Sequence, residues 1–218
     1  MAKEEKPYTI SARQLFAIRN SRDVIDLTLS ADLGLGKGIP LGSTVLLGGK
    51  FKSGKTSIAL QYAANAQKKY GAKIFFANVE GRLDNKILSQ VQGIDLDNFE
   101  VIMGPPIYDQ NKKIVGNKKM TAEEWWDRIG EIISNNRRSV IIVDSISSLS
   151  DESELSEKMG HMSRGMLQRL EAQFKRKYGD IIIPSEITLF LLAEIQANTS
   201  GLGESIQMKC GNALRHIS

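Results

Sequence analysis

One segment constrains this chain more than any other: residues 49–56 read GKFKSGKT and fit the phosphate-binding pattern G-x-x-x-x-G-K-[ST]. An apolar, strand-like run (44–48) precedes the segment, and a helix-like run (55–70) follows it. A glycine-rich turn in this setting points backbone N–H groups at an anion, and the helix N-terminus adds partial positive charge. The context argues against a chance match in a glycine-rich loop and predicts a nucleoside triphosphate site.

The pattern also predicts roles for single residues. We expect Lys55 to reach the β- and γ-phosphates and the Thr56 hydroxyl to bind Mg²⁺. The residues expected to surround the nucleotide are Gly49, Lys50, Phe51, Lys52, Ser53, Gly54, Lys55, Thr56 and Ser57.

Composition limits the class of protein. A chain of 218 residues with 41% hydrophobic and 25% charged residues suits one large domain, with or without an arm. The single cysteine, Cys210, excludes an internal disulfide framework and fits a reducing compartment. No apolar stretch approaches the ~20 residues that a membrane span needs, and the first ten residues carry no signal-peptide core. We therefore expect a cytoplasmic protein, and the net charge of +4 permits an anionic partner without requiring one.

Apolar and amphipathic segments alternate from residue 44 onward, and the apolar ones are continuous. This pattern is typical of a parallel sheet with helices on both faces. Thr121 and Glu124 form a capping-box pattern at the start of one helix. We predict an α/β fold with strands at 44–48, 73–79, 99–103, 139–143 and 187–193, and helices at 55–70, 84–92, 121–135 and 161–178.

Residues 1–38 are predicted to form an N-terminal helical arm ahead of a core at 39–218. Two stretches of the arm, 11–20 and 21–30, show helical spacing, and each opens with a serine that suits an N-cap. The glycine-rich stretch 34–38 is interpreted as a turn, since no strand precedes it as a dinucleotide-binding fingerprint would require.

The region 104–120 interrupts the alternation and is expected to be irregular. A solvated loop is the default interpretation, and a loop that contacts nucleic acid is the alternative. The region holds one acid, Asp109, against four lysines: Lys112, Lys113, Lys118 and Lys119.

Acidic residues end two of the predicted strands. The carboxyl ends of parallel strands meet at one edge of a sheet, so Glu80 and Asp144 should both lie near Lys55. We expect Asp144 to hold Mg²⁺ together with Thr56, with Ser145 as a partner nearby, and Glu80 to orient or deprotonate the attacking water. The alternatives are an aspartate that starts a turn or caps the next helix, and a glutamate on the surface.

Four segments together resemble the RecA family of recombinases: GGKFKSGKTS, FFANVEGRLD, VIIVDSISSL and GNALRHIS. The resemblance runs from about Ile39 to Ser218, and the divergent loops look more like a phage-encoded member. It implies a P-loop NTPase core of the RecA type that binds ATP and Mg²⁺ in the cytoplasm of a bacterial or phage-infected cell. It also implies a DNA-dependent ATPase that forms a helical homo-oligomeric filament on single-stranded DNA. Such a filament promotes homologous pairing and strand exchange with double-stranded DNA, in recombination and repair.

The resemblance also implies roles around the nucleotide. Glu80 becomes the catalytic base that activates water. Asp84 falls where the family contacts the adenine amino group. Ile87 takes the place of the family's stacking aromatic residue, so base recognition would be apolar packing.

The family threads single-stranded DNA through two loops, which correspond here to 151–163 and 195–211. Met162 matches the apolar wedge of the first loop. Gly211 and Asn212 match the end of the second, where backbone amides contact phosphate. A flexible surface loop is the alternative in each case. The nearest cations for phosphate contact are Arg164, Arg169 and Lys209.

The family places a polar sensor, usually glutamine, after the last apolar strand, where it couples the γ-phosphate to the second DNA loop. Glu194 takes that place here. A carboxylate beside a γ-phosphate is repelled unless it is protonated or bridged by a cation. Gln196 shares the strand face two residues on, so either residue could be the sensor.

In the family, further strands follow the segment that ends this sequence, and they carry basic residues that reach the neighbouring subunit's ATP. The resemblance therefore implies a core that is incomplete at its C-terminal end. We expect residues 1–218 alone to bind ATP weakly and to form filaments poorly. Two other interpretations stay open: a RecA-fold ring ATPase of the replicative-helicase or clock type, and a degenerate ATP-binding module without turnover.

Overall fold

The computed structural model describes residues 11–13, 22–27, 38–150, 166–197 and 206–208. The first proposed DNA loop and most of the second lie outside these ranges. Among the helices of the described ranges, none combines the length and the apolar composition of a membrane span. Arg169 is described and exposed, whereas the other five proposed DNA contacts fall outside the described residues: Met162, Arg164, Lys209, Gly211 and Asn212.

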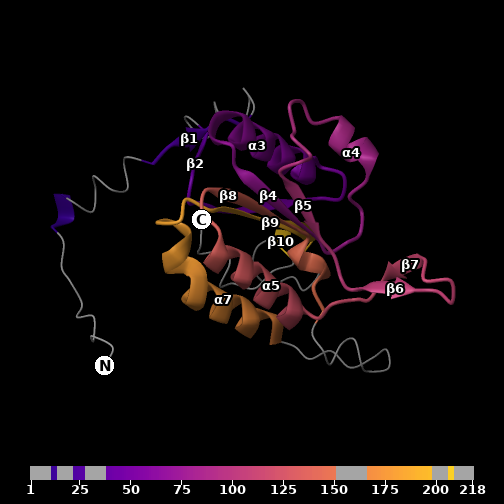
Figure 1. The fold of residues 1–218 in the computed structure, drawn as a ribbon. Coiled ribbons are helices and arrows are strands. Elements are labelled where there is room, and N and C mark those ends of the chain that lie inside the picture. Colours follow the sequence, from indigo (N-terminus) through magenta and orange to yellow (C-terminus); the bar gives the residue numbers. More distant parts are fainter. Residues whose placement is uncertain (1–10, 14–21, 28–37, 151–165, 198–205, 209–218) are drawn as a thin grey trace, which may run out of the picture.

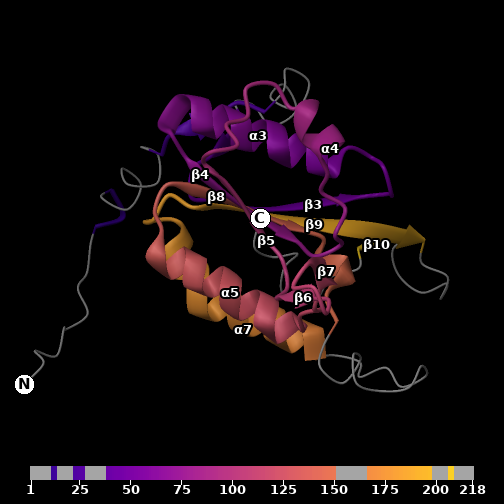
Figure 2. The ribbon, with the colours of Figure 1, turned by 45° about the vertical axis from the view of Figure 1, so that its right-hand side comes forward.

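A largely parallel sheet forms the centre of the fold (Figures 1 and 2). The predicted strands are confirmed as β3 (Thr44–Gly49), β4 (Lys73–Asn78), β5 (Phe99–Ile102), β8 (Ser139–Asp144) and β9 (Thr188–Ala197). They pair in the order β3-β9-β8-β4-β5, and each neighbouring pair is parallel. A short strand, β10 (Ile206–Met208), pairs antiparallel with the far end of β9.

Helices cover both faces of the sheet, as the sequence predicted (Figure 2). The helices α3 (Lys55–Tyr70) and α4 (Asn85–Ser89) lie on one face, and α5 (Ala122–Asn135) and α7 (Met166–Ile182) lie on the other. Each face has its own cluster of buried side chains. The central strands β4 and β8 are buried on both sides, which explains why their sequences are continuously apolar.

The start of α5 shows the predicted capping box. Thr121 Oγ1 accepts a hydrogen bond from the N–H of Glu124 at 3.2 Å, and Glu124 Oε2 accepts one from the N–H of Thr121 at 2.8 Å. The Trp126 ring then packs on Phe174 of α7, with ring centroids 4.5 Å apart. The cap fixes where the helix begins, and the aromatic contact joins the two helices on this face.

Part of the N-terminal arm differs from its prediction. β1 (Val24–Ile25) pairs antiparallel with β2 (Ile39–Pro40), so the helix predicted at 21–30 is wrong at these positions. Ile25 and Leu27 are buried while the residue between them is exposed. That two-residue period belongs to an extended chain, and burial against the core outweighed the helical spacing.

The insertion 104–120 is also more regular than expected. β6 (Pro106–Tyr108) and β7 (Ile114–Asn117) form an antiparallel hairpin that projects from the body of the fold (Figure 1). Asp109 organises its turn, since its Oδ1 accepts two backbone N–H bonds from the turn, both at 2.8 Å. An aspartate that caps a turn with its side chain is a weaker sequence signal than a glycine pair, and the prediction missed it.

Candidate functional site

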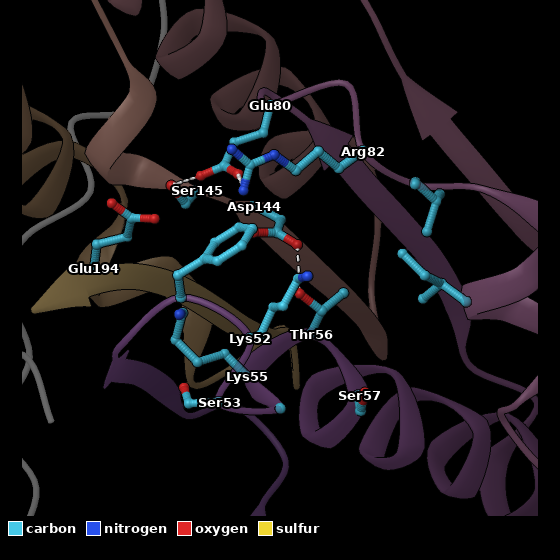
Figure 3. A pocket seen from close by; sticks show the side chains of 14 residues that line it. Lys52, Ser53, Lys55, Thr56, Ser57, Glu80, Arg82, Asp144, Ser145 and Glu194 are labelled. Carbon is cyan, nitrogen blue, oxygen red and sulfur yellow. Dashed lines mark hydrogen bonds and ion pairs between the residues drawn. The ribbon is translucent and has the colours of Figure 1, made fainter.

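The phosphate-binding loop joins β3 to α3 at the carboxyl edge of the sheet (Figure 3). Gly54 forms the N-cap of α3 with a φ of 86°, a left-handed conformation that glycine adopts without steric cost. Lys55 Nζ donates hydrogen bonds to the carbonyl oxygens of Gly49 and Lys50, both at 3.0 Å. The ammonium group is thereby held over the loop, at a helix N-terminus that favours anions.

Asp144 and Thr56 meet across the cavity floor, where β8 ends beside α3. Thr56 Oγ1 donates to Asp144 Oδ2 at 2.7 Å. Burial raises the pKa of Asp144 above its ordinary value, the Thr56 hydrogen bond lowers it, and the charge of Glu80 raises it. A carboxylate and a hydroxyl in contact offer two oxygen atoms of the kind that Mg²⁺ prefers.

Asp144→Asn is expected to raise the melting temperature of the Mg²⁺-free protein at about pH 7 and to remove Mg²⁺-dependent nucleotide binding. The pKa of Asp144 is higher in the folded protein than in the unfolded chain. Between these two pKa values the folded protein holds a proton that the unfolded chain has lost. Stability therefore falls as pH rises from the lower pKa through the higher one. Thermal melts near pH 7 and near pH 3 measure the effect, which should shrink at the lower pH. A lower melting temperature at pH 7 would contradict the prediction.

Glu80 follows β4 and lies at the same edge, where its N–H donates to the carbonyl oxygen of Asp144 at 3.1 Å. Its Oε1 accepts hydrogen bonds from Ser145 Oγ at 2.5 Å and Ser148 Oγ at 3.0 Å. Its Oε2 lies 2.7 Å from Arg82 Nη1. The side chain of Glu80 is only 10% exposed, so it is not the surface glutamate of the alternative interpretation.

Apart from Ser148, these side chains line one cavity of about 420 Å³, a size typical of small-molecule sites. Gly49 and Lys50 take part through their carbonyl bonds to Lys55 instead of lining the cavity. The sequence analysis did not predict Arg82 and Ser148. Their only sequence signal is that Arg82 follows Glu80 by two residues and Ser148 follows Ser145 by three. The lining residues are Phe51, Lys52, Ser53, Gly54, Lys55, Thr56, Ser57, Glu80, Arg82, Leu83, Ile87, Asp144, Ser145 and Glu194.

The two residues proposed for adenine differ in position. Ile87 lines the cavity. Asp84 is exposed and caps α4, since its Oδ1 accepts the N–H of Ile87 at 2.8 Å. The helix ends at Ser89, earlier than the predicted 92. Contact between Asp84 and the adenine amino group stays a prediction.

Glu194 is the sensor candidate that reaches the cavity. The register of β9 places it opposite Gly49 of the phosphate-binding loop, and its N–H donates to Ser147 Oγ at 2.8 Å. Gln196 lies beyond the end of β3 and pairs through its backbone with Gln207 of β10. The structure describes the backbone of Gln196 but not its side chain. The backbone register favours Glu194, and the sensor role stays a prediction.

Glu194→Gln is expected to tighten binding of a non-hydrolysable ATP analogue by about threefold to tenfold, because it removes a negative charge beside the terminal phosphate. Binding of ADP should change little, since ADP lacks that phosphate. Fluorescence titrations with the two nucleotides measure the difference. Weaker binding of the ATP analogue would show that a cation bridges the carboxylate and the phosphate.

The fold and the site define a P-loop protein of the α/β class, with the loop, the strand-ending acids and the cavity at one edge of a mostly parallel sheet. The RecA N-terminal domain family matches residues 18–218. The chain therefore belongs to that family, which confirms the resemblance seen in the sequence.

Curated relatives agree with this assignment. A Protein RecA of a Nitratiruptor species is 29% identical over 191 residues, covering 86% of this chain and 51% of the relative. A Protein RecA of a Sulfurovum species is 32% identical, covering 87% and 50%. The mitochondrial DNA repair protein recA homolog 3 of Arabidopsis thaliana is 29% identical, covering 86% and 40%. The chain thus spans about half the length of the curated relatives it matches.

Proposed function

We propose that this chain is the ATP-binding part of a DNA recombinase that hydrolyses ATP on single-stranded DNA and promotes pairing and strand exchange with double-stranded DNA. The observation that carries the proposal is the position of Glu80, a shielded carboxylate at the edge of a P-loop cavity. The names of the relatives, Protein RecA and a DNA repair protein, support the recombination and repair context.

ATP with Mg²⁺ is the proposed cofactor pair. Thr56 and Asp144 fit the ion, because their oxygens are already in contact at the cavity floor. When bound, Mg²⁺ would neutralise charge on the phosphates. Lys55 would bind the β- and γ-phosphates, and the apolar wall at Ile87 would pack on the base, with Asp84 as the proposed partner of the adenine amino group.

Glu80 is the proposed general base. Ser145 and Ser148 both donate to Oε1, so the carboxylate is held in one orientation. A fixed carboxylate near the γ-phosphate position can accept the proton of an attacking water, and positioning of this kind is the main contribution of protein groups to phosphoryl transfer.

DNA contacts are proposed at the two loops and at a second basic surface. Arg164, Arg169 and Lys209 are the proposed phosphate contacts of the loops, with Met162 as a wedge. The hairpin β6–β7 is the proposed second surface, because the four lysines of its segment are exposed. Gly211 and Asn212 are the further proposed contacts of the second loop. The exposed lysines of the hairpin segment are Lys112, Lys113, Lys118 and Lys119.

A helical homo-oligomer is the proposed assembly, with residues 1–38 as the polymerisation arm. Ile25 and Leu27 pack into the core of their own chain. Contact with a neighbouring subunit would therefore come from other residues of the arm.

The test is hydrolysis of ATP by the purified chain with Mg²⁺, with and without single-stranded DNA, together with electron microscopy. We expect weak turnover that DNA stimulates, and helical filaments that form poorly. Closed rings would favour the ring ATPase instead. Nucleotide binding without turnover under both conditions would favour a binding module, and the absence of nucleotide binding would overturn the proposal.

A further inference from the structure

We propose that Arg82 is a second cation of the nucleotide site, which donates hydrogen bonds to the terminal phosphate of a bound nucleoside triphosphate while it orients Glu80. This inference rests on the proposed ATP hydrolysis. It adds a positioning residue to which neither the phosphate-binding pattern nor the family resemblance gave a role.

Arg82 bridges two walls of the cavity (Figure 3). On the strand side, its Nη1 lies 2.7 Å from Glu80 Oε2. On the loop side, its guanidinium carbon lies 4.9 Å from the centroid of the Phe51 ring. An ion pair and a cation–π contact together hold a side chain that is otherwise 58% exposed. The guanidinium is therefore placed between the phosphate-binding loop and the proposed base.

The guanidinium keeps donors for a ligand. Arginine carries five N–H donors in a planar fork that matches phosphate oxygens, and the 2.7 Å contact with Glu80 involves Nη1. Contact with the face of the Phe51 ring engages the charge of the guanidinium and uses none of its in-plane N–H groups. Arg82 can thus hold Glu80 and a phosphate oxygen at the same time.

The charge of the cavity also favours this role. Glu80, Asp144 and Glu194 all line it, and a triphosphate would add several negative charges. Arg82 lines the same cavity and supplies a positive charge against these groups.

The proposed step shows where Arg82 acts. The oxygen of water forms a bond to the γ-phosphorus, and the proton of the water passes to Glu80. The bond between that phosphorus and the bridging oxygen breaks, and its electron pair leaves with ADP. Arg82 stabilises charge on the terminal phosphate and fixes the Oε2 side of Glu80. Its loss should affect ATP more than ADP, and hydrolysis more than binding.

The test uses three variants of the full chain. Arg82→Gln removes the charge and Arg82→Lys keeps the charge without the fork. Arg128→Gln is the matched control, because Arg128 pairs with a carboxylate, Glu131, at 2.9 Å on the exposed side of α5. Each variant is titrated with a non-hydrolysable ATP analogue and with ADP in Mg²⁺. Single-turnover hydrolysis of radiolabelled ATP is measured on single-stranded DNA, and circular dichroism checks folding.

For Arg82→Gln we expect the dissociation constant of the ATP analogue to rise about 10-fold and that of ADP to change by less than about twofold. The single-turnover rate should fall about 100-fold. Arg82→Lys should restore binding of the analogue but leave the rate low, because a point charge cannot hold Glu80 and phosphate together. Arg128→Gln should match the unaltered chain.

Equal weakening of the analogue and ADP by Arg82→Gln, or a rate within about threefold of the unaltered chain, would overturn the role. Equal losses in Arg128→Gln would also overturn it, since the effect would then be one of surface charge. If Arg82→Gln does not fold, Arg82→Lys decides: a full rate refutes the proposal. Failure of the unaltered chain to bind either nucleotide would instead refute the proposed function.

Discussion

Glu80→Gln is expected to lower the rate of ATP hydrolysis by about 10³-fold while the affinity for ATP stays within about threefold. Glutamine has nearly the same shape, and its amide oxygen can still accept the hydroxyls of Ser145 and Ser148. The amide cannot take the proton of water. The loss therefore falls on kcat rather than on KM. Steady-state hydrolysis on single-stranded DNA and equilibrium titration with an ATP analogue measure the two quantities.

Glu131→Gln is the matched control for this variant. Glu131 also pairs with an arginine, Arg128, but it lies on the exposed surface of α5, so turnover should be that of the unaltered chain. If Glu80→Gln keeps more than about a tenth of the turnover, Glu80 is not the base. Glu194 would then be the next candidate, since it is another carboxylate of the cavity. A parallel loss of ATP binding would show that Glu80 shapes the site instead of transferring a proton.

The central sheet could be predicted because its signal is local. Runs such as 140–143 and 189–193 are apolar without interruption, which is typical of strands covered on both faces. The errors lie where structure depends on distant or weak signals. β1 exists because Ile25 is buried against the core and pairs with Ile39 of β2. The two strands are distant in the sequence, and the local spacing of apolar residues does not predict such a pairing. The hairpin depends on hydrogen bonds from Asp109 to its own turn.

The candidate site could be predicted where its residues end strands. Parallel strands bring their carboxyl ends to one edge, so the proximity of Asp144 and Glu80 did not require the strand order. Arg82 and Ser148 could not be found in this way. Arg82 lies in the loop after β4, and Ser148 ends a short 3-10 helix after β8 (Ile146–Ser148). They meet at Glu80 because these two segments approach each other in space. The sequence predicted the position of Glu80, whereas its contacts with Arg82 and Ser148 could be found only from the structure.

Lys55→Ala is expected to weaken ATP binding by about 100-fold or more. The Lys55 ammonium is held over the loop by the carbonyl oxygens of Gly49 and Lys50. Opposite unit charges about 4 Å apart, at an effective dielectric constant of about 20, attract by about 4 kcal/mol before desolvation is counted. Alanine is a good helix former at the first position of α3, so the fold should persist. Calorimetric titration with ATP and Mg²⁺ measures the loss.

Lys68→Ala is the control, because Lys68 is exposed in the last turn of the same helix and does not line the cavity. Binding of ADP distinguishes the role of Lys55 from that of Arg82. Lys55 is expected to contact both the β- and γ-phosphates, so Lys55→Ala should weaken ADP as well as ATP, whereas Arg82→Gln should spare ADP. If Lys55→Ala also spares ADP, the ammonium contacts the terminal phosphate alone. Unchanged ATP affinity in Lys55→Ala would show that the loop does not bind phosphate, and hydrolysis at this cavity would lose its basis.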